Sequence, residues 1–209
     1  MEWISFRNST ALSILVSNLL LLIATLYFRW DGLSVFVIYI IETIIIGFYH
    51  VCKLFILGHL NHIGRIRIDG APPFLGTVGT ALFFMFHFGF FVFIQTMLIL
   101  PHESSSFIKT FLSIGDYIGG SNTWIIISFI VINLFALIKY IFIDDVYQGK
   151  EFNTILMEPY PRIFVQQFVV IIGGGILMIF GSSLVFVLFF ILVKTLIELN
   201  VDLFTKSVK

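Results

Sequence analysis

The sequence has very little charge. Charged residues make up 11% of its 209 residues, whereas a soluble domain carries about 25%. Such a chain has too little polar surface to face water, which excludes an ordinary soluble domain and indicates that its solvent is lipid. The mean hydropathy of +1.06 also indicates a chain embedded in lipid. The formal net charge is zero and there is no basic run, so binding of nucleic acid is also excluded.

Cysteine and catalytic motifs are equally scarce. Cys52 is the only cysteine, so no intrachain disulfide or thiolate cluster can form. The chain contains no H-E-x-x-H, P-loop, Rossmann or serine nucleophile-elbow pattern. The first apolar stretch lacks a small-residue cleavage site, which favours a retained membrane span over a signal peptide.

The residues that are present form apolar blocks about 20 residues long, the length with which a helix crosses a bilayer. No block alternates in polarity as a barrel strand does. We therefore expect an all-α, polytopic transmembrane bundle with six spans in a single domain, residues 1–209. The expected spans are about 9–28, 33–57, 74–100, 122–143, 162–180 and 183–200. The polar segment between the third and fourth spans predicts a short interfacial helix around 104–114.

The distribution of cations predicts the orientation. With six spans, nine cations fall on the side of the two termini or on its flanks, and two fall on the opposite side. The positive-inside rule then places both termini in the cytoplasm of a multi-pass cell-membrane protein. The nine are Arg7, Lys53, Arg65, Arg67, Lys139, Lys150, Arg162, Lys206 and Lys209.

Polar residues inside the expected spans are the candidate site. An ionisable side chain at mid-depth costs at least about 2.5 kcal/mol on insertion scales, which makes each one a functional candidate. Lys194 and Glu198 stand at i, i+4 and are close enough to pair. The candidates for a polar core are Glu42, His87, Gln95, Asn133, Arg162, Gln167, Lys194 and Glu198. Two interpretations stay open: structural contacts between helices, or a polar pocket or proton path.

A metal site has weaker support. His87 and Glu42 are the best candidate ligands, but a metal site needs three or four. We expect no metal and no cofactor. His87 and Gln95 lie about 80° apart around a helix, so both are compatible with one cavity. The first span carries only small polar side chains, such as Asn18, and is expected to be the most peripheral.

Four short stretches carry a resemblance to a known family. They are I-Y-I-I-E ending at Glu42, F-H-F-G around His87, P-Y-P-R-I around Arg162, and K-T beginning at Lys194 and followed by Glu198. The chain resembles a family of small bacterial and archaeal multi-pass membrane proteins catalogued as a domain of unknown function. That family pattern, with recurring histidines, implies an intramembrane metal or haem site.

The chain departs from that pattern at the later histidine positions. Those positions hold Gln95, Asn133, Gln167 and Asp202. Neutral amides are poor ligands for transition metals but can replace imidazole as hydrogen-bond partners. The resemblance therefore supports the fold and disfavours a metal or haem group in this chain.

Three functions remain. The favoured one is a non-enzymatic accessory protein or small carrier with a buried polar core. The second is an intramembrane metal- or haem-dependent enzyme that uses Glu42 and His87. The third is a purely structural or interaction subunit. The expected surroundings are the lipid bilayer, with a protein partner or a second copy of the chain.

Overall fold

The computed structural model describes residues 9–60, 73–100, 122–143, 152–180 and 184–207, together with residues 109, 112, 114–115, 118–120 and 147–148. Within these residues the chain is all-α. The elements are α1 (Ser9–Phe28), α2 (Gly32–Leu60), α3 (Pro73–Ile99), α5 (Asn122–Ile138), the π-helical η2 (Lys139–Ile143), α6 (Phe152–Met157), α7 (Tyr160–Phe180) and α8 (Leu184–Ser207). The expected interfacial helix around 104–114 lies largely outside the described residues.

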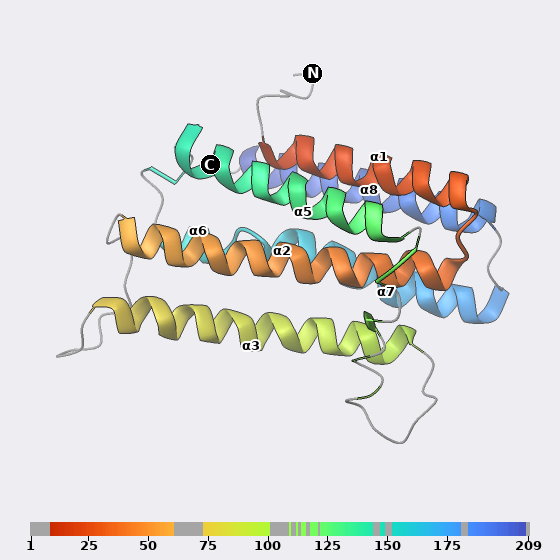
Figure 1. Cartoon of the computed structure of the whole chain (residues 1–209), viewed down its shortest axis with the longest axis horizontal. Helices are drawn as coiled ribbons and strands as arrows, with labels where there is room; N and C mark the ends of the chain where they lie inside the picture. The colour runs from red at the N-terminus through yellow and green to blue at the C-terminus, as the bar shows by residue number, and fades with distance from the viewer. Residues whose placement is uncertain are drawn as a thin grey trace.

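The long helices lie alongside one another and run in alternating directions (Figure 1). Helix α2 is central, because it packs against α3, α5 and α7. On one side of α2 lies α3, and on the other lie α1, α5 and α8, with α1 packed against both α5 and α8. This arrangement gives α2 the largest buried share of any candidate span and leaves α3 and α5 mostly exposed.

Four helical segments of the described chain are long and apolar enough to cross a membrane. They are Gly32–His59, Leu75–Ile99, Asn122–Ile143 and Thr154–Ile176. Leu12–Phe28 forms a shorter apolar helix. The protein is therefore an all-α, multi-pass membrane protein by helix length and composition.

The turn between α1 and α2 is a capped helix start. Arg29 adopts a positive φ of 52°, and the ring of Trp30 stacks on that of Phe28 with centroids 5.8 Å apart. The Ser34 amide donates to the Asp31 carboxylate at 2.9 Å, which satisfies a free N–H of the first turn. The cap fixes the residue at which α2 begins, directly after the turn that reverses the direction of the chain from α1.

Small residues set the closest helix contacts. Gly47 of α2 faces the ring of Phe88 on α3, and Gly173 of α7 faces the rings of Phe36 and Phe190. A Cβ at Gly173 would lie 2.6 Å from the Phe36 ring. Because lipid is as apolar as these side chains, helices in a membrane associate through such close packing rather than through a hydrophobic driving force.

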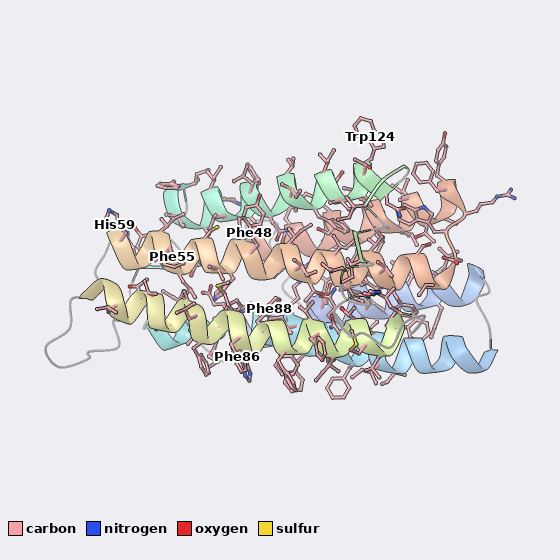
Figure 2. The ribbon with its side chains drawn as sticks, turned by 60° about the horizontal axis from the view of Figure 1, so that its bottom comes forward. Phe48, Phe55, His59, Phe86, Phe88 and Trp124 are labelled. Atoms are coloured by element: carbon pink, nitrogen blue, oxygen red, sulfur yellow. The ribbon has the colours of Figure 1, made fainter. Side chains whose placement is uncertain are left out.

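Large apolar side chains cover the outside of the bundle (Figure 2). Phe86 and Trp124 point away from the helices, Phe48 is also exposed, and Phe88 lies between α2 and α3. An exposed surface of this kind would drive a soluble protein to aggregate. In a bilayer it is the surface that lipid chains solvate.

Candidate functional site: a buried ion network

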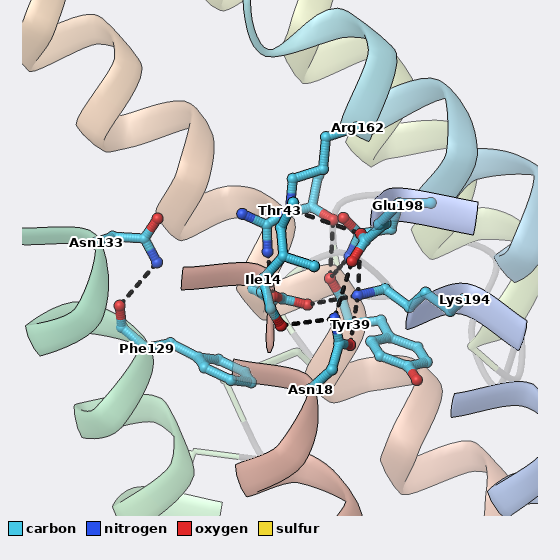
Figure 3. A network of polar contacts seen from close by, with 11 residues as sticks. Ile14, Asn18, Tyr39, Thr43, Phe129, Asn133, Arg162, Lys194 and Glu198 are labelled. Carbon is cyan, nitrogen blue, oxygen red and sulfur yellow. Dashed lines mark hydrogen bonds and ion pairs between the residues drawn. The ribbon is translucent and has the colours of Figure 1, made fainter. Parts of the chain in front are cut away.

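Four charged side chains from three helices meet inside the bundle (Figure 3). Arg162 of α7 donates through Nη2 to Glu42 Oε1 of α2 at 2.7 Å. Lys194 of α8 lies 3.2 Å from Glu42 Oε2 and 3.1 Å from Glu198 Oε1. The Arg162 Nε lies 3.6 Å from Glu198 Oε1. We call Glu42, Arg162, Lys194 and Glu198, with Asn18, the ion network.

Asn18 brings a fourth helix, α1, into the ion network. Its Oδ1 accepts from Lys194 Nζ at 3.0 Å, and its Nδ2 donates to Glu198 Oε2 at 2.9 Å. The same Nδ2 also donates to the Ile14 carbonyl at 3.0 Å. The prediction that the first span is the most peripheral is therefore wrong, because one short amide is enough to join α1 to the charges of α8.

The charges of the ion network compensate one another, although Arg162 Nε and Glu198 Oε1 are buried without a hydrogen bond. Lys194 Nζ donates hydrogen bonds to Asn18 Oδ1 and Glu42 Oε2 and forms an ion pair with Glu198 Oε1 at 3.1 Å. Each carboxylate oxygen of Glu42 and Glu198 faces a cation or the Asn18 amide. Two anions balance two cations. Only Arg162 keeps some exposure, 13% of its side chain, so the charges are mutually compensated rather than open to a ligand.

Several neutral polar groups are buried on α2, α3 and α7. Gln166 donates through Nε2 to the Tyr39 carbonyl at 2.6 Å, and Lys194 Nζ lies 4.6 Å from the centroid of the Tyr39 ring. The Gln166 and Gln167 side-chain carbonyls, the Tyr39 hydroxyl and both amide atoms of Gln95 are buried without a hydrogen-bond partner. In an apolar solvent each such atom costs free energy.

A second charged cluster lies nearer the end of the bundle where α2 ends. Lys53 of α2 pairs with Glu158, just after α6, at 3.1 Å. The Tyr140 hydroxyl of η2 donates to the same carboxylate at 2.7 Å, and Lys53 Nζ lies 3.9 Å from the Tyr140 ring centroid. We call these three residues the Lys53 cluster. It couples α2, the π-helical end of α5 and the approach to α7.

The structure separates two of the expected site residues from the ion network. His87 is exposed and packs among the rings of Phe83, Phe91 and Tyr160. Gln95, on the same helix, is fully buried. The expectation that both face one cavity is wrong, because the 80° between them places one inside the bundle and the other on its aromatic flank.

Asn133 also stands apart. Its Nδ2 donates to the Phe129 carbonyl of its own helix at 2.8 Å, and the side chain is half-buried (Figure 3). The structure thus brings together four of the eight expected site residues, Glu42, Arg162, Lys194 and Glu198. Two others, Gln95 and Gln167, are buried on α3 and α7. The last two, His87 and Asn133, make other contacts.

The donor set does not fit a metal. Glu42 is committed to Arg162 and Lys194, and His87 contacts rings rather than carboxylates. Among the described residues no group of three His, Cys, Asp or Glu side chains lies together. The weak metal candidates of the sequence, His87 and Glu42, do not form a shared site.

Sequence reasoning missed Asn18, Tyr140 and Glu158. Asn18 sits in the middle of an apolar helix, where an amide needs a partner, and that position was the available signal. Tyr140 and Glu158 lie beside polar loops, where a solvated role is the ordinary expectation. Only the return of the chain at α6 brings Glu158 to Lys53.

An all-α bundle with lipid-facing aromatic rings around a compensated ion network defines a multi-pass membrane protein with a polar core. The chain belongs to a family of unknown function, DUF6498, whose match covers residues 1–209. No curated protein and no solved structure matches the chain.

Proposed function

We propose that the protein is a non-enzymatic, six-span carrier whose polar core admits a small solute, with both termini in the cytoplasm. The closed ion network carries this proposal. It holds four helices together at zero net charge, and it leaves neither a free carboxylate nor a free amine to act as a base or nucleophile.

A purely structural role explains the network less well. A buried ion pair is often no more stabilising than apolar side chains of the same volume. Four ionisable groups inside a bilayer are therefore an expensive way to join helices, and such groups mark pathways and binding sites by default. The buried Gln95 amide and the buried Gln167 carbonyl have no hydrogen-bond partner, which favours an occupant that supplies their hydrogen bonds.

The six-span orientation rests on charge and topology together. The ends of α2 and α5 and the starts of α3 and α7 lie at one end of the bundle in Figure 1, and the cation-rich segments of the sequence flank that end. The positive-inside rule assigns it to the cytoplasm.

Cysteine accessibility tests the carrier. With Cys52→Ser as background, a single Gln95→Cys is exposed in sealed vesicles of either orientation to a membrane-impermeant maleimide. A carrier visits states open to each side, so we expect labelling from both faces. Phe86→Cys, which faces lipid, is the matched control on the same helix and stays unlabelled. Labelling of Gln95→Cys from one face only, or from neither, overturns the carrier.

A further inference from the structure

We infer that Gln95 and Gln167 form a binding site for a small, uncharged solute of the primary carboxamide or urea class. This inference rests on the proposed carrier function and names its solute. We call the two residues the amide site.

Two contacts on either side bring the amide site together. The rings of Phe91 on α3 and Phe164 on α7 lie 6.5 Å apart between centroids, and Ile99 of α3 lies against Gly174 of α7. Gln95 stands midway between Phe91 and Ile99, and Gln167 lies between Phe164 and Gly174. The parallel course of α3 and α7 therefore puts both amides at one level.

The two side chains also lie on the helix faces with which α3 and α7 contact each other. Gln95 precedes Ile99 by four residues and Gln167 precedes Gly174 by seven, the spacings that return a helix to the same face. Ile99 and Gly174 are in contact. Gln95 is fully buried, with neither amide atom bonded, and the Gln167 carbonyl is buried without a partner.

The chemistry of the site selects the solute. A side-chain amide has one acceptor oxygen and an NH2 donor group in one plane, so a second planar amide can donate to the oxygen and accept from the NH2 group. A charged solute is disfavoured, because the nearby charges already balance one another and a new ion would be uncompensated in the bilayer. A site built to hydrogen-bond a solute also rejects analogues that lack those groups.

The probe is radiolabelled urea, taken up by proteoliposomes of the full chain. We expect urea uptake well above that of protein-free liposomes, and acetate uptake, which tests a charged solute of similar size, no faster than in protein-free liposomes. Gln95→Leu and Gln167→Leu should each lower urea uptake by at least about tenfold, since each removes hydrogen bonding to the solute and leaves it unpaired in an apolar site.

Gln148→Leu is the matched control, because Gln148 is exposed and outside the helices; its uptake should equal that of the parent protein. Gln95→Met replaces Gln95→Leu if the latter does not give a monodisperse protein. Urea uptake no faster than in protein-free liposomes, or unchanged in both amide-site variants, overturns the inference. If Gln95→Cys is nevertheless labelled from both faces, the carrier stands and only its solute is wrong.

Discussion

Lys194 shows how a single cation is held inside an apolar bundle. Its ammonium group donates hydrogen bonds to α1 and α2 and forms an ion pair with a carboxylate of its own helix. Removing one member of such a set leaves an uncompensated charge in a poor solvent, which is more costly than the set itself is stabilising. The cost of a substitution in the ion network therefore depends on what charge remains behind.

Charge removal should show this asymmetry. Glu42→Gln leaves two cations facing one anion, and Lys194→Met leaves two anions facing one cation; each should lower the free energy of unfolding by about 3–5 kcal/mol. The double variant keeps Arg162 beside Glu198 and balances again, so it should be more stable than either single variant. Denaturant titration of the protein in detergent measures all three. Additive losses in the double variant would contradict the network.

Tyr140 tests the Lys53 cluster in the same way. Tyr140→Phe removes the hydrogen bond to Glu158 and keeps the ring beneath Lys53. A hydrogen bond to a charged group contributes about 1.5–3 kcal/mol, so we expect the free energy of unfolding to fall by this amount. Tyr147→Phe, in the following loop, is the control and should be neutral. Equal stability of the two variants would show that the Tyr140 bond is not formed in the membrane.

At the scale of elements, some glycines allow neighbouring helices to approach closely. Gly47 on α2 and Gly173 on α7 each leave no room for a Cβ, while Gly79 and Gly89 on α3 face open space. The sequence pattern alone does not distinguish these glycines, since all four sit in apolar helices. The distinction arises from which face each helix turns to its neighbour.

Substitution by leucine should separate the two kinds of glycine. Gly47→Leu forces α2 and α3 apart and should destabilise the protein by at least about 1–3 kcal/mol, the usual cost of overpacking. Gly89→Leu, on α3, adds a side chain that lipid solvates and should be nearly neutral. Thermal unfolding in matched detergent compares them. A neutral Gly47→Leu would mean that α2 and α3 do not pack at this register.

At the scale of the whole molecule, the alternating helices divide the loops between the two ends of the bundle. Gln148 follows η2, at the end that the charge bias assigns to the cytoplasm in the proposed orientation, and Gly119 precedes α5, at the opposite end of that helix. In a Cys52→Ser background, an impermeant maleimide should label Gln148→Cys only in inverted vesicles and Gly119→Cys only in right-side-out ones. The reverse pattern, or labelling of both from one side, would refute the six-span orientation.

The sequence determined the solvent, the helical class and the approximate helix bounds, because charge content and the length of apolar blocks are local properties of the chain. It also indicated the Lys194–Glu198 pair, whose spacing lies within one helix. Tertiary structure alone decided that Asn18 and Arg162 complete the network, that His87 lies apart from Glu42, and that Glu158 returns to Lys53. Those contacts join residues far apart in the chain, and they depend on the rotation and depth of each helix, which apolar periodicity leaves open when lipid and core are equally apolar.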